Sequence, residues 1–381
     1  MGIIFLILAL ILLLPDAYIL FGVIGKSPWW LKGLFLLPTA AYYFVIVRMF
    51  WLGDMRQSML NLLFWLTLCV VFPLILFSLI SLVGKGIGLL WTPAAVLSNW
   101  LALAISLVWL GIAVYGIVVG WKKVTVEEVE ISSDKIPAAF DGYRIVQLSD
   151  FHIGTYMAAP GTVDRIVSEV NSLKPDLIVF TGDLVNSSSE EIGQFTSVLS
   201  RMEARDGILS VLGNHDYCLY KQYTGSYSPE RELAEVIRIE EAVGWRLLRN
   251  ESVRIMRGND SIAIVGVDNA GSRMFPDKSD LPKALRGLSE EEFKILLSHD
   301  PSHWRREVLP TTGIDLTLSG HTHAMQFKIG NWSPSKWTYP EWGGLYKEGK
   351  QQLYVSTGIG ENIAFRFGAY PQIVVLTLDR K

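Results

Sequence analysis

The first 123 residues are almost wholly apolar, and this feature limits the possible fold more than any other. They contain only seven lysines or arginines and two acids. A helix needs about 20 mainly apolar residues to cross a bilayer. Four stretches are that long, at about residues 3–23, 34–51, 59–82 and 94–119. We therefore expect residues 1–123 to form an all-α transmembrane domain of about four helices.

Two other interpretations of this region are weaker. The first stretch could be a cleaved signal peptide, but it lacks a basic start and three more apolar stretches follow it. A soluble helical bundle would show a polar face on each helix, and these stretches mostly do not. Four spans would put both termini on one side, together with Arg56, Lys122 and Lys123. This slight charge bias favours a C-terminal domain that faces the cytoplasm. The membrane itself is expected to be a bacterial inner membrane.

The remaining residues, 124–381, have a different composition and predict a separate domain. They hold 27 basic and 35 acidic residues. An acidic domain argues against nonspecific nucleic-acid binding, which needs a basic surface, so no nucleic-acid partner is expected. Short β-rich runs alternate with helical stretches, for example a run at 143–148 followed by a helix at about 162–173. A second amphipathic helix is expected at about 190–203.

Five predicted strands stop at residues that can bind metals or move protons. These strands are 143–148, 176–181, 208–212, 295–297 and 315–318. Further strands are expected at 262–267, 353–356 and 372–378. The carboxyl ends of strands are where α/β proteins build their sites. The sequence therefore predicts one site made from five separated segments.

The segments that follow these strands form an ordered set of motifs. They are Asp150-x-His152, Gly182-Asp183, Gly213-Asn214-His215-Asp216, His299, and Gly320-His321-Thr322-His323. Each motif alone is a weak signal, because single Asp-x-His pairs are common in soluble domains. The complete set resembles the calcineurin-like metallophosphoesterases at all five of their motifs. The resemblance covers about Tyr143 to Leu378. It implies an α/β (α+β) fold, a four-layer β-sandwich of two mixed sheets flanked by helices.

The resemblance also implies a role for each motif residue. Asp150, His152, Asp183 and His323 would hold a first metal, and Asp183, Asn214, His299 and His321 a second one. Asp183 would bridge the two metals. Asn214 would contact the substrate phosphate, and His215 would contact that phosphate or protonate the leaving oxygen. Asp216 would orient His215.

The chemistry explains why these residue types are needed. Phosphate esters are anionic and repel nucleophiles, and two divalent metals neutralise that charge and activate a bridging water. Neutral imidazole ligands favour Mn, Fe, Zn or Co over Mg, with Mn as our first expectation. One departure from the family is that Ala324 and Met325 follow His323, where the family often has two glycines. This departure concerns the shape of the loop and leaves the ligands unchanged.

Two aromatic segments surround the predicted site. Residues 330–349 are rich in Gly, Pro, Trp and Tyr, and residues 217–229 contain four tyrosines. Either segment could simply pack on the sandwich. Alternatively, the 330–349 segment could be a membrane-facing lip that admits a lipid-linked phosphate, with 217–229 as the opposite wall. The run 356–360 with Arg366 resembles the membrane-anchored branch of the family, which includes enzymes that act on UDP-diacylglucosamine. This resemblance implies that Arg366 binds a substrate phosphate.

The sequence as a whole predicts a membrane-anchored phosphoesterase. It would use a metal-activated hydroxide to hydrolyse a phosphate ester or pyrophosphate bond in a lipid-linked or nucleotide-linked substrate. One alternative is a nucleotide or cyclic-nucleotide phosphodiesterase. Another, from a different class, is a scaffold with a catalytically dead phosphoesterase fold. The second alternative predicts lost ligands, whereas all seven are present.

Overall fold

The chain forms two compact units in a computed structural model that describes residues 13–52, 56–221, 223, 228–271 and 275–381. The N-terminal unit comprises residues 1–119 together with the short segment 363–365. The C-terminal unit comprises residues 120–362 and 366–381. The division at Val119 lies close to the boundary expected from composition.

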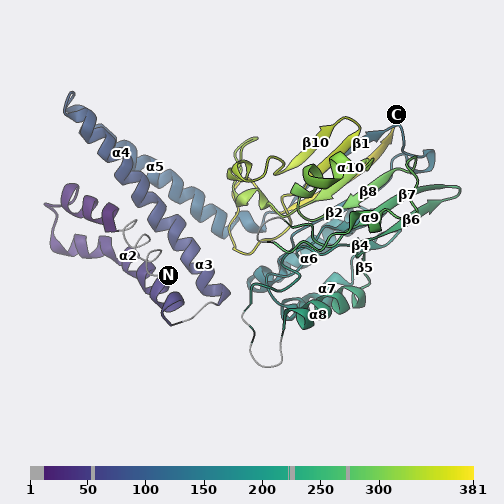
Figure 1. The fold of residues 1–381 in the computed structure, drawn as a ribbon. Helices are drawn as coiled ribbons and strands as arrows, with labels where there is room; N and C mark the ends of the chain where they lie inside the picture. Colours follow the sequence, from purple (N-terminus) through teal and green to yellow (C-terminus); the bar gives the residue numbers. More distant parts are fainter. Residues whose placement is uncertain (1–12, 53–55, 222, 224–227, 272–274) are drawn as a thin grey trace. The chain divides into compact units, whose positions relative to one another are not determined.

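The N-terminal unit is helical (Figure 1). A helix at Leu13–Gly22 is followed by α2 (Trp29–Phe50), α3 (Gln57–Leu66), a π-helical turn (Thr67–Val71), α4 (Phe72–Gly88) and α5 (Pro93–Val118). The π-helical turn precedes Pro73, whose ring nitrogen has no proton to donate, and such a local widening lets the helix continue through a proline. Helices α4 and α5 pack closely at Gly84, where a Cβ atom would collide with the side chain of Ser98.

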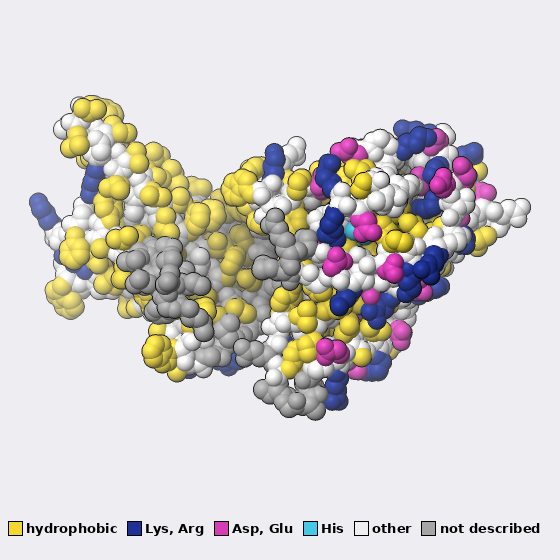
Figure 2. Space-filling view, viewed as in Figure 1, with side chains coloured by type: hydrophobic (Ala, Val, Ile, Leu, Met, Phe, Trp, Pro, Cys, Tyr) yellow, Lys and Arg dark blue, Asp and Glu magenta, His cyan; other side chains and the backbone are white. Residues whose placement is uncertain are grey.

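Three helices among the described residues are long and apolar enough to cross a membrane: Trp29–Phe50, Gln57–Gly88 and Pro93–Lys122. They match the second, third and fourth predicted stretches. The first predicted stretch begins in residues 1–12, which lie outside the described residues, so only its end at Leu13–Gly22 can be compared. Apolar side chains cover the surface of these helices (Figure 2). An exposed apolar surface of this extent is typical of helices that face lipid.

The C-terminal unit contains two six-stranded mixed sheets. The first has the order β1-β12-β2-β3-β4-β5 and the second the order β10-β11-β9-β8-β7-β6. The first sheet consists of β1 (Thr125–Ser133), β12 (Gln372–Arg380), β2 (Arg144–Leu148), β3 (Leu177–Phe180), β4 (Ile208–Ser210) and β5 (Arg246–Leu247). The second consists of β10 (Gly344–Glu348), β11 (Gln351–Val355), β9 (Leu316–Ser319), β8 (Lys294–Leu297), β7 (Asp260–Gly266) and β6 (Glu251–Arg257).

The two sheets pack face to face and bury the main core between them. Alternate residues of each strand point into this layer, for example Ile145 of β2 and Val179 of β3 against Ile264 of β7 and Leu297 of β8. The outer face of the second sheet is covered by α9 (Leu281–Ala284) and the helical turns at 304–311, which pack through Trp304. Helices α6 (Gly161–Ser172), α7 (Thr196–Leu199) and α8 (Pro229–Ala242) flank the first sheet (Figure 1). The predicted sandwich of two mixed sheets flanked by helices is confirmed.

All of the predicted strands are present, and one predicted helix is not continuous. Residues 190–203 form a 3-10 segment (Ser189–Phe195) and the single α-turn of α7. The carboxylate of Glu191 accepts hydrogen bonds from the backbone N–H groups of Asn186 and Ser187, at 2.6 and 3.0 Å. The Glu191 side chain thus binds the loop before it, and Gly193 lies inside the segment. Both features favour a 3-10 segment here over a regular α-helix. Sequence reasoning did not predict α8.

Candidate metal centre

The predicted ligands follow the carboxyl ends of five strands, as expected. Strands β2, β3 and β4 are parallel neighbours in the first sheet, and β8 and β9 are parallel neighbours in the second. The loop after β2 carries Asp150 and the loop after β3 carries Asp183, while the loops after β8 and β9 carry His299 and His321. The two sheets therefore present their loops at one edge of the sandwich. The structure brings the six charged or imidazole ligands into clusters there.

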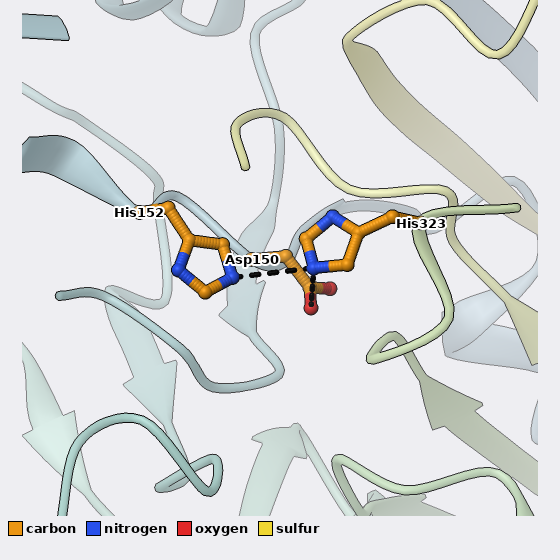
Figure 3. A group of neighbouring side chains, drawn as sticks. All are labelled: Asp150, His152 and His323. Carbon is orange, nitrogen blue, oxygen red and sulfur yellow. Dashed lines mark hydrogen bonds and ion pairs between the residues drawn. The ribbon is translucent and has the colours of Figure 1, made fainter. Parts of the chain in front are cut away.

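The first cluster contains Asp150, His152 and His323 (Figure 3). The imidazole rings of His152 and His323 face each other, with their Nε2 atoms 3.2 Å apart. The Nε2 atom of His323 is also 3.4 Å from Oδ1 of Asp150. Asp150 is held from behind by Ser149, whose hydroxyl donates to Oδ2 at 2.5 Å.

The second cluster contains Asp183, His299 and His321. Nε2 of His299 is 3.0 Å from Oδ2 of Asp183 and 3.2 Å from Nδ1 of His321. The same Oδ2 atom of Asp183 lies 3.6 Å from Nε2 of His152, which belongs to the first cluster. The Asp183 carboxylate therefore lies between the two clusters, the position needed for the predicted bridging ligand.

Five of the seven predicted ligands have a left-handed backbone, a conformation that L-residues rarely adopt. Their φ angles are 53° at Asp150, 44° at His152, 61° at Asp183, 72° at His321 and 49° at His323. Such a conformation costs about 1–2 kcal/mol per residue and persists only where the surroundings impose it. Strain of this kind concentrates at functional sites, which supports a functional role for the three loops, after β2, β3 and β9, that carry these residues.

Burial controls the protonation of the histidine ligands. It lowers the pKa of His321 to about 4 and the pKa values of His152 and His323 well below their usual value. These rings are therefore neutral at pH 7, as metal coordination requires. Burial would also lower the pKa of His299, but the adjacent carboxylate of Asp183 outweighs it and raises this pKa to about 10.

These observations fit two divalent cations. Ring nitrogens of different histidines lie 3.2 Å apart in both clusters, which is close enough for both nitrogens of a pair to bind one cation. The side chain of Asn214 is buried, and its Oδ1 atom has no hydrogen-bond partner. A buried amide oxygen without a partner is costly unless a ligand such as a metal completes it. The mixture of imidazole, carboxylate and amide donors suits such a centre.

His215 lies beside this centre and is oriented by backbone. Its Nδ1 atom is 2.6 Å from the carbonyl oxygen of Asn186, so Nδ1 carries the proton and donates it. Its Nε2 atom accepts a hydrogen bond from Nδ2 of Asn362, at 3.3 Å. The ring lies 4.8 Å from that of His152, between centroids. Nε2 is therefore the ring atom that can exchange a proton with a substrate.

Asp216 differs from its predicted role of orienting His215. Its buried carboxylate accepts backbone N–H groups from the loops after β3 and β4. The donors are Asp183, Leu184 and Gly213 at 2.8 Å and Val185 at 3.3 Å. The carbonyl of Asn186 orients His215 instead. Asp216 thus fixes the strained loop that carries the bridging Asp183.

Arg366 also differs from its predicted role. Its guanidinium is completely buried and donates to the carbonyl oxygens of Thr357 and Ala369, both at 2.9 Å, and of Gly360 at 2.5 Å. It also faces the carboxylate of Glu361, at 3.5 Å. A guanidinium used in this way cannot reach a substrate phosphate. Arg366 instead holds together the loop beside His323.

The aromatic segments differ in what they expose. We call four of the exposed apolar side chains in and next to residues 330–349 the apolar lip: Met325, Ile329, Trp332 and Trp337. Trp337 is 79% exposed and packs edge-on against Trp332, with ring centroids 5.7 Å apart. The lip begins two residues after His323. The tyrosine segment 217–229 is described only in part, and Tyr227 lies outside the described residues.

Sequence reasoning missed the individual residues of these segments that touch predicted ligands. Tyr339 contacts His321 and Tyr220 contacts Asn214. It also missed Asn362, which lies outside both segments and contacts His215. The aromatic composition of the two segments was the only signal. It identified the segments but could not identify which hydroxyl reaches which ligand.

Comparison with known proteins agrees with the geometry. Residues 143–325 match the model of the calcineurin-like phosphoesterase family. The uncharacterized metallophosphoesterase YkuE of Bacillus subtilis is 32% identical over 262 residues, which cover 66% of this chain and 84% of that protein. The chain therefore belongs to the calcineurin-like metallophosphoesterases, and it is a metal-dependent phosphoester hydrolase.

Two further relatives have more specific names. A transmembrane protein with a metallophosphoesterase domain from Danio rerio is 34% identical over 289 residues, or 74% of this chain. The match spans 62% of the Danio rerio protein's own length. The UDP-2,3-diacylglucosamine pyrophosphatase LpxG of Chlamydia muridarum is 26% identical over 290 residues, covering 63% of this chain and 84% of that protein.

Proposed function

We propose that this protein is a dinuclear-metal hydrolase that cleaves a phosphate ester or pyrophosphate bond in a lipid-linked substrate or lipid precursor. The observation that carries the proposal is the pair of ligand clusters that share Asp183. We propose Mn as the metal, because imidazole and carboxylate ligands together suit Mn, Fe, Zn or Co better than Mg. Two such cations would neutralise the phosphate charge and supply an activated water.

The residues of the chain would do the rest of the chemistry. Asp216 holds the loop of Asp183, so the bridging carboxylate stays in place when substrate binds. The hydrogen bond from Nδ1 of His215 to the carbonyl of Asn186 fixes the ring and leaves Nε2 as the nitrogen that can meet a substrate. When protonated, that nitrogen can donate to the leaving oxygen of the substrate. Asn362, bonded to the same nitrogen, would yield to the substrate.

Three observations support a lipid-linked substrate. The chain has helices of membrane-spanning length. The apolar lip exposes two tryptophans close in sequence to His323, and exposed indoles favour the interface between water and lipid. A relative is named for activity on a diacylated nucleotide sugar, and its class of substrate combines acyl chains with a pyrophosphate.

The test compares three substrates with purified full-length protein and Mn in lipid nanodiscs. The substrates are a generic aryl phosphodiester, UDP-diacylglucosamine and the same UDP-sugar without acyl chains. We expect preference for the acylated compound, and loss of turnover in Asp183→Ala and His215→Ala. Equal turnover by all three proteins would refute a metal-dependent hydrolase. A preference for the unacylated compound would favour a nucleotide phosphodiesterase.

A further comparison tests the apolar lip. Replacing Trp332 and Trp337 by serine should lower turnover of the acylated substrate and leave the aryl phosphodiester unaffected. Serine at the exposed Met256, which lies on β6 outside the lip, is the matched control. An equal loss on both substrates would refute a role in lipid access.

We also propose that the protein resides in a bacterial inner membrane with its C-terminal unit in the cytoplasm. The proposal rests on the basic residues Arg56, Lys122 and Lys123 at the ends of the spans on that side. Reporter fusions at the C-terminus test it. Alkaline phosphatase should be inactive there and a fluorescent protein should be bright, and the reverse result would overturn the assignment.

A further inference from the structure

Two tyrosine hydroxyls contact predicted ligands of the second metal, and neither contact is explained by the proposed reaction. The hydroxyl of Tyr339 lies 2.8 Å from Nε2 of His321, and the hydroxyl of Tyr220 lies 2.9 Å from Nδ2 of Asn214. The two tyrosines come from the two aromatic segments, Tyr339 from 330–349 and Tyr220 from 217–229. Neither segment supplies a predicted metal ligand.

The contact with Tyr339 determines which nitrogen of His321 can bind a metal. A neutral imidazole carries one proton, and its other nitrogen has the free lone pair. Nδ1 of His321 lies 3.2 Å from Nε2 of His299, on the side of the second cluster. If Nδ1 binds the metal, the proton is on Nε2, which then donates to the hydroxyl oxygen of Tyr339. This hydrogen bond fixes both the tautomer and the direction of the ring.

The contact with Tyr220 does the same for an amide. Nδ2 of Asn214 donates to the hydroxyl oxygen of Tyr220. The other end of the amide, Oδ1, is buried and has no hydrogen-bond partner. Only the oxygen of an amide binds a cation, so this orientation leaves the correct atom available. In both pairs, the tyrosine oxygen accepts a hydrogen bond from an N–H group of the ligand. That N–H group lies on the opposite end of the ligand side chain from the atom that would bind the metal.

We propose that Tyr339 and Tyr220 are positioning residues that hold His321 and Asn214 in the orientation needed for the second metal. The proposal rests on the metal centre of the proposed function and does not depend on the substrate. It links the two aromatic segments to one metal and not to the other. The first cluster is held differently, because Asp150 is bonded to Ser149 and His323 to the carbonyl of Gly360.

A simpler alternative is that the tyrosines only fill space. The ring of Tyr339 packs against the small cluster of Ala324, Trp342 and Ala369, and the ring of Tyr220 lies 4.4 Å from that of His215. Phenylalanine keeps the ring and removes only the hydroxyl. Tyr→Phe variants therefore separate packing from positioning.

Each aromatic segment offers a matched control. The hydroxyl of Tyr346 accepts backbone N–H groups from Trp342 and Gly343, at 3.2 and 3.4 Å. The hydroxyl of Tyr223 donates to the carbonyl of Cys218, at 2.6 Å. Neither bond involves a predicted ligand. Tyr346→Phe and Tyr223→Phe therefore remove a hydroxyl from the same segments without touching the cluster.

The experiment is calorimetric titration of Mn²⁺ into metal-free, full-length protein in detergent. Wild type should show two sites. Tyr339→Phe and Tyr220→Phe should each weaken one site by roughly 10- to 100-fold and leave the other unchanged, as expected for loss of an outer hydrogen bond to a ligand. The two control variants should change neither site by more than about 3-fold. In Tyr339→Phe and Tyr220→Phe, electron paramagnetic resonance with fewer than two Mn²⁺ ions added per chain should show loss of the signal that comes from pairs of coupled Mn²⁺ ions.

The possible failures are distinguishable. If wild type binds two Mn²⁺ ions and both Tyr→Phe variants bind them equally well, the positioning role is refuted and the proposed function stands. If all four Tyr→Phe variants weaken binding alike, packing of the segments is responsible and the inference is overturned. If wild type itself binds fewer than two ions, the dinuclear centre fails and the inference fails with it.

Discussion

The buried carboxyl of Glu240 should make the stability of the C-terminal unit depend on pH. Glu240 lies on α8 and is completely buried. Its Oε2 atom accepts a hydrogen bond from the hydroxyl of Ser210, at 2.5 Å, and Oε1 has no hydrogen-bond partner. Burial, reinforced by the negative charge of Asp216, raises the pKa of Glu240 to about 8. In an unfolded chain this pKa is close to 4.5.

The sign and size of the effect follow from proton linkage. Between pH 4.5 and 8 the folded protein holds a proton on Glu240 that the unfolded chain has released. Stability therefore falls as pH rises through this window and levels off above pH 8. One pKa unit corresponds to about 1.36 kcal/mol. Between pH 5 and 9, Glu240 should lower the free energy of unfolding by roughly 4 kcal/mol.

Glu240→Gln should remove this contribution, because glutamine does not titrate. Pulse proteolysis in urea, with full-length protein at pH 5, 7 and 9, measures the free energy of unfolding of wild type and variant. The difference between them should change by roughly 4 kcal/mol in favour of the variant from pH 5 to pH 9. Because only the change of this difference with pH is used, any pH-independent effect of the glutamine amide on the free energy of unfolding cancels. Glu241→Gln, on the exposed side of the same helix, is the control. Parallel pH curves for wild type and Glu240→Gln would refute the reasoning.

Three other substitutions test the loops around the centre. In Gly320→Ala the new methyl group would collide with the side chains of Ser149 and Asp150. Elemental analysis should therefore find about one metal ion fewer per chain than in wild type. An unchanged metal content would contradict this expectation. Met325 is exposed and has a φ of 43°, so Met325→Gly should have a higher free energy of unfolding than Met325→Ala, by about 1 kcal/mol. Equal stabilities of the two variants would show that the loop is not strained. Arg366→Met leaves several buried carbonyl groups without donors and should destabilise the protein by roughly 3–5 kcal/mol. A stable Arg366→Met protein with only a raised KM would restore the phosphate-binding role.

The sequence by itself determined the features that depend on local patterns. Apolar stretches of sufficient length predict membrane helices, because a bilayer imposes a minimum span. The strands ending before Asp150, Asp183 and His299 were predictable because β-rich runs and polar ends are local. The ligand set was predictable because each motif is a short run, and its order along the chain resembles a known family. Local patterns therefore gave the strands and the motifs, and the resemblance to the family gave the sandwich and the ligand set.

Only the tertiary structure decided which atoms meet across the site. Asp216 and Arg366 occur in the expected motifs, but their charges are used to bind backbone groups of neighbouring loops. The partner of His215 is a carbonyl oxygen, which no side-chain pattern can reveal. The hydroxyl of Tyr339 reaches His321 from 18 residues away through an irregular loop. Such contacts depend on loop geometry and burial, which are set by the packing of the two sheets.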